Sequence, residues 1–414
     1  MAIIKAFRAI RPAEEFADKV AALPYDVMNS EEAREMVKDN PYSFLHVDKA
    51  EVDLDREINI YDKVVYETAS GNLNKMIEDG VLKEEEKPCY YAYRQIMNGR
   101  AQTGIVVCTS IDDYMNNIIK KHEFTRADKE QDRINHVDYC NANTGPIFLT
   151  YRNNERISAI INESTEGKPV YDFVAEDGIA HIVWLIEEEA LINELTELFK
   201  GIDYLYIADG HHRAASAVKV GMKRREENPS YTGEEEFNYF LSVLFPDNEL
   251  YIMDYNRVVK DLNGYTEEEY MDKLKESFDV EEYKGQGQYR PEAKHTYGMY
   301  LEGKWYVLKA KEGTFKEEDP VERLDVSILQ KNLLAPILGI EDPRTDKRID
   351  FIGGIRGLEE LERRVKEGMK VAFSMYPTTI EELMDIADAG QVMPPKSTWF
   401  EPKLRSGLFI HKLI

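Results

Sequence analysis

The segment from Tyr204 to Val220 constrains the fold of this chain more than any other. Tyr204–Ala208 is a short, mostly apolar run of the kind that forms a buried strand. Asp209-Gly210 interrupts this run, and Ala214–Val220 continues with the residue types of a helix. A buried strand that turns directly into a helix belongs to layered α/β architectures. We therefore predict an α/β (α+β) fold.

The residues of this turn, Asp209-Gly210-His211-His212-Arg213, suit phosphate chemistry. The free N–H groups and the dipole at a helix start favour an anion, and Gly210 lets the backbone turn sharply beside a ligand. Arg213 offers a planar fork of donors to phosphate oxygens. His211 and His212 can donate to phosphate, move protons or bind metal, while Asp209 can hold Mg²⁺ or act as a base. An ordinary Asp-Gly turn is the alternative, but polar groups beside a buried strand need partners, which favours a functional site.

The charge balance of the chain restricts its partners. With 78 acidic and 53 basic residues, the formal net charge is -25. Such a surface repels nucleic acids and anionic membranes but leaves room for a local basic pocket that binds a nucleotide. The N-terminus lacks the apolar core of a signal peptide, and no apolar run approaches the roughly 20 residues of a membrane span. We therefore expect a cytoplasmic protein with neither a nucleic-acid nor a membrane partner.

The cysteine content excludes two further classes of site. Cys89, Cys108 and Cys140 are the only cysteines, and no two of them are closely spaced. An odd number without close pairs argues against a disulfide framework and against a cysteine-ligated zinc site.

A second candidate segment is His122-Glu123, followed by the polar helical stretch Asp128–Tyr139. A His-Glu pair alone is more often a surface pair than a site, so both interpretations stay open here. Gly353–Gly357 is either a connecting turn or a phosphate loop. Pro394–Lys403 either lines a pocket or closes the fold.

We divide the chain into three regions: an N-terminal α/β region over 1–108, an expected catalytic core over 109–260, and a C-terminal α/β domain over 261–414. In the core, periodicity predicts an amphipathic helix over Ile186–Phe199 and a strand over Phe240–Phe245. In the C-terminal region it predicts a strand over Thr296–Leu301 and a helix over Val321–Leu338.

Four motifs in this order resemble the domain-of-unknown-function family 1015: Leu23–Val27, Lys121–Thr125, Ala208–Arg213 and Met393–Thr398. The resemblance spans nearly the whole chain. The central part looks like the ParB/sulfiredoxin fold, and within it the motifs are most similar to those of the free-serine kinases. Those enzymes phosphorylate the hydroxyl of free L-serine with ADP or ATP and Mg²⁺.

The resemblance implies roles for particular residues. Glu123 matches the catalytic glutamate, and Asp209, His211, His212 and Arg213 match the phosphate-handling turn. We accordingly expect catalytic roles for Glu123, Asp209 and His211, with Asp209 holding Mg²⁺. The residues expected to bind ATP or ADP are His122, Gly210, His212 and Arg213.

Three functions stay open at this stage. The first is a phosphotransferase that takes phosphate from ATP or ADP to the hydroxyl of free L-serine or a similar small hydroxy compound. The second is a phosphatase acting on phosphoserine or another phosphomonoester. The third is a nucleotide-binding switch without small-molecule turnover. The sequence does not indicate an oligomeric state.

Overall fold

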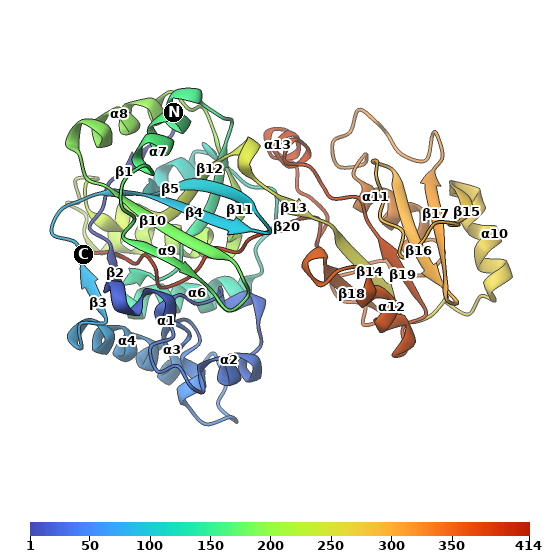
Figure 1. Cartoon of the computed structure of the whole chain (residues 1–414), viewed down its shortest axis with the longest axis horizontal. Coiled ribbons are helices and arrows are strands. Elements are labelled where there is room, and N and C mark those ends of the chain that lie inside the picture. Colours follow the sequence, from blue (N-terminus) through green and yellow to red (C-terminus); the bar gives the residue numbers. More distant parts are fainter. The chain divides into compact units, whose positions relative to one another are not determined.

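The computed structural model describes all residues, Met1–Ile414, and the chain forms two compact units (Figure 1). The first unit contains Met1–Leu250 and Pro402–Ile414, and the second contains Tyr251–Glu401. The first boundary expected from the sequence lies at residue 108. In the structure, strand β5 (Arg100–Ser110) runs through this position and pairs with β4 (Tyr90–Met97) on one side and β12 (Tyr239–Pro246) on the other. The regions 1–108 and 109–260 therefore share one sheet.

A nine-stranded mixed sheet is the centre of the first unit. Its pairing is antiparallel except for β11 with β6 and β12 with β8. Across the sheet the strands are β6 (Ile119–Lys120), β11 (Leu205–Asp209), β8 (Ile147–Tyr151), β12, β5, β4, β10 (Ala180–Ile186) and β9 (Tyr171–Val174), with β1 (Ile4–Lys5) paired to β5. The α/β class predicted from the sequence is confirmed.

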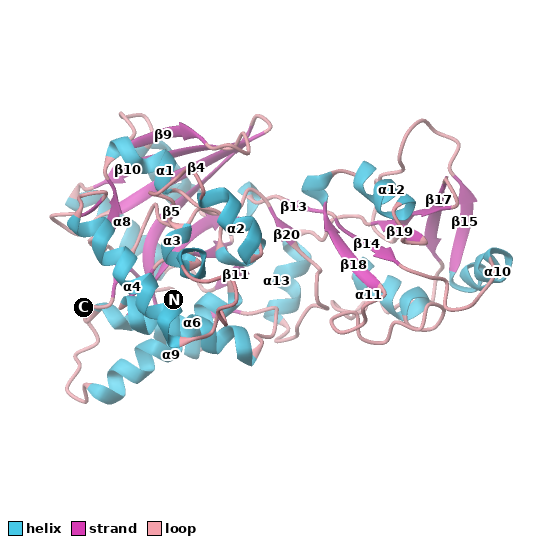
Figure 2. Ribbon diagram, turned by 90° about the horizontal axis from the view of Figure 1, so that it is seen from below, coloured by secondary structure: helices cyan, strands magenta, loops and turns pink.

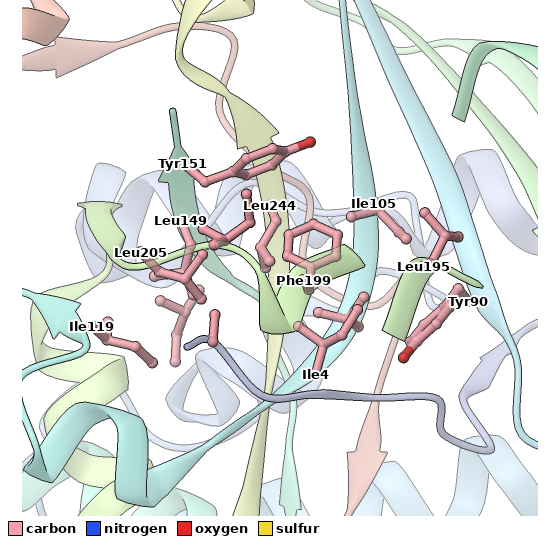
Figure 3. Close-up of a cluster of buried hydrophobic side chains, with 14 of the residues drawn as sticks. Ile4, Tyr90, Ile105, Ile119, Leu149, Tyr151, Leu195, Phe199, Leu205 and Leu244 are labelled. Atoms are coloured by element: carbon pink, nitrogen blue, oxygen red, sulfur yellow. The ribbon is translucent and has the colours of Figure 1, made fainter. Parts of the chain in front are cut away.

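Two amphipathic helices, α7 (Glu155–Ser164) and α8 (Glu189–Lys200), pack their apolar sides on one face of this sheet. Figure 3 shows the core that they close, in which Phe199 lies among strand residues. The Phe199 ring packs edge-on against Tyr151, with ring centroids 5.1 Å apart. The helix predicted over Ile186–Phe199 is wrong at its start, because α8 begins at Glu189. Ile186 is the last residue of β10 and is buried against the same core.

The opposite face of the sheet is covered by the end of the chain. Side chains alternate between the two faces of a strand, so Tyr91 and Tyr93 point away from the core of Figure 3. Both rings meet Phe409, at centroid distances of 5.1 and 5.8 Å. The neighbouring Ile410 belongs to a second apolar cluster. That cluster includes residues of α1 (Ala17–Val20), α2 (Ser30–Val37), α3 (Leu45–Asp48), α4 (Lys63–Glu78) and α6 (Ala127–Cys140).

The remaining elements of the first unit are short, apart from α9 (His211–Glu227), which packs on α6. The strands are β2 (Ile10–Pro12) paired with β3 (Leu82–Glu84), and β7 (Ala142–Asn143) paired with β21 (His411–Lys412). The helices are α5 (Ile111–Met115) and the 3-10 turns Glu14–Phe16, Tyr25–Val27, Ala50–Asp53, Glu236–Asn238 and Asp247–Glu249. None of the helices in either unit has the length and apolar character required to cross a membrane.

The second unit has its own six-stranded, fully antiparallel sheet (Figure 2). In order the strands are β15 (Phe278–Glu282), β17 (Lys304–Ala310), β16 (Thr296–Leu301), β19 (Val371–Ser374), β14 (Tyr255–Val259) and β18 (Ile349–Gly353). The other elements are β13 (Ile252–Met253) paired with β20 (Trp399–Phe400), and helices α10 (Glu267–Ser277), α11 (Asp325–Leu329), α12 (Glu359–Lys366) and α13 (Ile380–Asp388).

Two sequence expectations for the second unit have different outcomes. The strand predicted over Thr296–Leu301 is β16, with the same bounds. The single helix predicted over Val321–Leu338 is wrong, because α11 ends at Leu329 and a π-helical stretch follows over Gln330–Leu334. Gly353–Gly357 forms the end of β18 and a 3-10 turn before α12, so it connects a strand to a helix.

We predict that Gly221→Ala destabilises the first unit by about 1–3 kcal/mol, the usual cost of overpacking. Gly221 is buried in α9, and an added Cβ would lie 2.5 Å from the carbonyl oxygen of Phe237. Gly71 is the matched control, because it lies exposed in α4 with nothing within 4 Å of an added Cβ. Gly71→Ala should therefore stabilise the protein by roughly 0.5–1 kcal/mol. Urea unfolding of both variants measures the difference, and equal effects would contradict the packing described for α9.

Candidate functional site

The junction between β11 and α9 is a sharp turn centred on Gly210. The pairing of β11 with β8 shifts register between Ile207 and Asp209, which places a bulge directly before the turn. Gly210 is the N-cap of α9 and has a φ of 93°, in the left-handed region that glycine adopts without strain. A Cβ at this position would also lie 3.2 Å from Nε of Arg213. Gly210 therefore permits both the turn and the close approach of Arg213.

Strand β6 brings the second candidate segment to the same place. It runs parallel to β11, with Ile119 opposite Leu205 and Lys120 opposite Tyr206. The residues that follow β6 therefore run beside the end of β11. There the backbone N–H of His122 donates to Nε2 of His211 over 3.5 Å. The structure thus brings the His122-Glu123 pair to the start of α9.

The first three side chains of α9 point to different partners. His211 is buried, with its Nδ1 3.8 Å from Oε2 of Glu123, and its ring packs edge-on against that of His122. His212 accepts the backbone N–H of Arg126 through Nε2 over 3.0 Å. Arg213 donates through one terminal nitrogen to the carbonyl oxygen of Pro146 over 2.7 Å. Successive helical residues diverge by about 100°, which explains the three directions.

Burial keeps the two inward-facing histidines neutral at neutral pH. Burial lowers the pKa of His122 to about 4, and the charge of Asp209 and a hydrogen bond to the backbone of Ile207 offset this only in part. Burial, together with the neighbouring His122, lowers the pKa of His211 well below its ordinary value. A neutral imidazole has one nitrogen lone pair available to accept a proton or to bind a metal.

Asp209 is engaged by the protein through both carboxylate oxygens. Oδ1 accepts the backbone N–H of Gly210 over 2.9 Å, and Oδ2 lies 3.2 Å from Nζ of Lys403. Burial acts to raise the pKa of Asp209, but the charges of Lys403 and Arg213 outweigh it and lower the pKa to about 2. Asp209 is therefore ionised and holds Lys403 beside the turn. Its role as the Mg²⁺ ligand stays a prediction, and such an ion would compete with Lys403 for Oδ2.

A small pocket lies beside the first turns of α9. Two guanidinium groups, those of Arg133 and Arg213, line it. Arg133 stacks over the Tyr25 ring at 4.0 Å and pairs with Asp132 at 2.8 Å. Nε of Arg213 is buried and has no hydrogen-bond partner. Burial acts to lower the pKa of Arg213, but nearby carboxylates, Asp26 first among them, raise it, so the group stays charged.

Another wall of the pocket is a buried hydrogen-bonded group that no pattern in the sequence predicts. Thr144 donates through its hydroxyl to Oδ1 of Asp48 over 2.7 Å, and Nε2 of His136 lies 3.5 Å from the same oxygen. Burial opposes the charge on His136, but Cys140 and Asp48 raise its pKa to about 9. Asp48 and His136 come from α3 and α6, and no local motif in the sequence links them.

Comparison with known proteins gives the family. The model described as "Protein of unknown function (DUF1015)" matches residues 4–327. The chain belongs to this DUF1015 family. The family predicted from the four motifs is thereby confirmed. None of the curated proteins matches the chain.

Several solved structures are similar to this DUF1015 protein. A free serine kinase in complex with AMP is 16% identical, with 74% of this chain and 92% of that chain covered and a TM-score of 0.35. A mutant of a free serine kinase in complex with ADP is also 16% identical, with 75% and 93% covered and a TM-score of 0.35. SbnI with a C-terminal truncation, from Staphylococcus aureus, is 11% identical, with 74% and 87% covered and a TM-score of 0.39.

We predict that the stability of the first unit falls as the pH rises towards 9. The pKa of His136, about 9 in the folded protein, lies above its ordinary value of 6.5. The stabilisation from protonated His136 is therefore complete below about pH 6.5 and is lost as the pH passes through about 9. Urea unfolding between these pH values should show the decline in wild type and a flatter profile in His136→Gln. Parallel profiles for the two proteins would contradict a charged His136.

Proposed function

We propose that this protein transfers a phosphoryl group from ATP or ADP to the hydroxyl of free L-serine or a similar small hydroxy compound. The observation that carries the proposal is the environment of Arg213. Its guanidinium lines a pocket together with Arg133, and its buried Nε has no hydrogen-bond partner within the protein. A buried donor without a partner is costly, and a phosphate oxygen is a suitable acceptor for it.

The start of α9 adds to this anion site. The first N–H groups of a helix have no partner within the helix, and the helix dipole places partial positive charge there. Lys403, held by Asp209, contributes a further cation beside the same turn. Phosphoryl transfer depends mainly on positioning and on cations that stabilise phosphate charge, and these groups supply both. The local cations also overcome the repulsion that a net charge of -25 exerts on a nucleotide.

The transfer also needs a group that accepts the hydroxyl proton, and we assign this role to Glu123. Its side chain is half exposed, with Oε2 3.8 Å from Nδ1 of His211 at the start of α9. A half-exposed carboxylate at the start of α9 can contact the hydroxyl of a substrate that reaches it from solvent. His211 orients this carboxylate, and His212 holds the backbone of the segment after Glu123 through the N–H of Arg126. Asp209 would hold Mg²⁺ in place of Lys403, and the ion would neutralise phosphate charge.

Free L-serine as the acceptor is based on the resemblance of the Lys121–Thr125 and Ala208–Arg213 motifs to those of free-serine kinases. The direct test incubates the purified protein with ATP or ADP, Mg²⁺ and L-serine, and follows the products by phosphorus NMR. A phosphomonoester signal that depends on both nucleotide and serine supports the proposal. Release of inorganic phosphate from O-phosphoserine without nucleotide would replace it with a phosphatase.

We expect Arg213→Ala to weaken nucleotide binding by roughly 10–100-fold, the worth of a hydrogen bond to a charged group. Arg213→Lys should also weaken binding, because a point charge cannot replace the planar fork. Arg224→Lys is the matched control on the same helix, where Arg224 pairs with Asp138. Isothermal titration calorimetry gives the affinities and circular dichroism checks folding. Wild-type affinity in a folded Arg213→Ala protein would contradict the phosphate site.

We expect Glu123→Gln to lower the rate of phosphoryl transfer by roughly 10²–10⁴-fold, the usual contribution of a general base. Nucleotide affinity should change little, because the substitution keeps the shape of the side chain and removes only its basicity. Glu227→Gln, at the end of α9, is the control for the same chemical change away from the site. A Glu123→Gln protein that turns over at the wild-type rate would remove Glu123 from the mechanism.

A further inference from the structure

We infer that His122, Glu123 and His211 form a binding site for a divalent transition-metal ion of the Zn²⁺ type. The inference concerns metal binding alone and does not depend on phosphoryl transfer. The ligand atoms that these three residues can offer all lie within 4.8 Å of one another. Two imidazoles and one carboxylate are a recognised ligand set for zinc, in which the ion keeps a coordination position open for water or substrate.

Two neighbouring strand ends and a helix start bring these three residues together. The parallel pairing of β6 with β11 carries His122 and Glu123 to the end of β11, and the turn at Gly210 sets His211 at the start of α9. The rings of His122 and His211 pack edge-on, with centroids 4.5 Å apart. Tetrahedral zinc with bonds of about 2.0–2.1 Å separates its ligand atoms by roughly 3.3 Å. The three side chains therefore need to draw together by about 1.5 Å at most.

His122 provides independent support for the site. The residue is 2% exposed, and its Nδ1 is buried with no hydrogen-bond partner. A neutral imidazole has one nitrogen whose lone pair can bind a metal ion. An unsatisfied buried nitrogen of this kind requires an explanation, and a metal ion supplies one.

His211 and Glu123 complete the site when the ring proton of His211 moves from Nδ1 to Nε2 and leaves Nδ1 free to bind the ion. Because Nε2 of His211 accepts the backbone N–H of His122, the proton of the neutral ring belongs on Nδ1, which faces Oε2 of Glu123 across 3.8 Å. A metal ion between the two atoms takes the place of that proton. Nε2 of His211 then carries the ring proton and gives up its long, 3.5 Å contact with the backbone N–H of His122. Metal binding therefore breaks this weak hydrogen bond, and the N–H of His122 and the Nε2–H of His211 both need new acceptors.

The donor atoms select the class of ion. Two of the three are imidazole nitrogens, which suit Zn²⁺ and other late first-row metals. Mg²⁺ prefers oxygen ligands in an octahedral arrangement and does not fit this set. The site is therefore distinct from the Mg²⁺ site proposed at Asp209. The cysteines do not contribute, since the three ligands are histidine and glutamate.

The test titrates Zn²⁺ into the full-length, untagged protein after treatment with a chelator, with no nucleotide present. Competition with a chromophoric chelator measures stoichiometry and affinity. We expect one zinc ion per chain in wild type, unaffected by excess Mg²⁺. His122→Ala and His211→Ala should lose more than the roughly 10–100-fold in affinity that removing a supporting hydrogen bond costs. His46→Gln is the control, because it removes a histidine–carboxylate pair, that with Asp53, outside the cluster.

Glu123→Gln decides the result if the buried histidine variants do not fold, since Glu123 is half exposed and its replacement keeps the shape. This variant should bind zinc more weakly, and the visible absorption spectrum of bound Co²⁺ should change relative to wild type. The inference is overturned if wild type binds no zinc, if Glu123→Gln and the folded histidine variants bind it as wild type does, or if His46→Gln abolishes binding. Phosphoryl transfer is measured separately, with Mg²⁺ and without zinc, so either proposal can fail without the other.

Discussion

Two residue pairs, Ile119 with Leu205 and Lys120 with Tyr206, hold β6 parallel to β11, and the candidate site depends on this pairing. Because the strands are parallel, the chain leaves both at the same edge of the sheet. One exit leads into His122-Glu123 and the other into the Gly210 turn. Each segment alone offers a few polar side chains near a strand end. Together they form a group of neutral imidazoles, a carboxylate and a helix start.

The charged groups closest to the site include several cations, although the protein as a whole is strongly negative. The formal net charge is -25, yet Arg133, Arg213 and Lys403 lie close to the start of α9 or line the pocket beside it. Each of these cations has an acidic neighbour, such as Asp209 for Lys403. Burying an unpaired charge is costly, so the carboxylates allow the cations to stay charged in partly buried positions. The protein therefore presents positive charge locally to an anion that its surface as a whole repels.

Local patterns predicted much of the fold and the first half of the site. The strand, turn and helix around Asp209-Gly210 are visible in the sequence because a buried strand, a glycine and a helical period follow one another directly. The same reasoning overextended the helix α8 to Ile186, since the apolar end of β10 runs almost directly into the apolar side of that helix. The likeness of the core to the ParB/sulfiredoxin fold stays a prediction.

The pocket could not be predicted in the same way, because its residues meet only through tertiary packing. Asp48 and His136 belong to helices α3 and α6, and no periodicity or spacing relates them. Lys403 reaches Asp209 from the end of the chain, where the sequence allowed either a pocket wall or closure of the fold. Contacts between residues far apart in the sequence depend on how the layers of the fold pack, and local sequence patterns do not reveal them.

Glu123 has a role both in zinc binding and in phosphoryl transfer, and it cannot perform the two at once. A carboxylate that binds a metal ion shares its lone pairs with the ion and is a weaker base for a hydroxyl proton. Zn²⁺ between Glu123 and His211 would therefore remove the base that phosphoryl transfer needs. Mg²⁺, which the nitrogen ligands do not suit, would leave Glu123 to act. The same three side chains would then respond in opposite ways to the two ions, because the fold places imidazole nitrogens, and not further oxygens, beside this carboxylate.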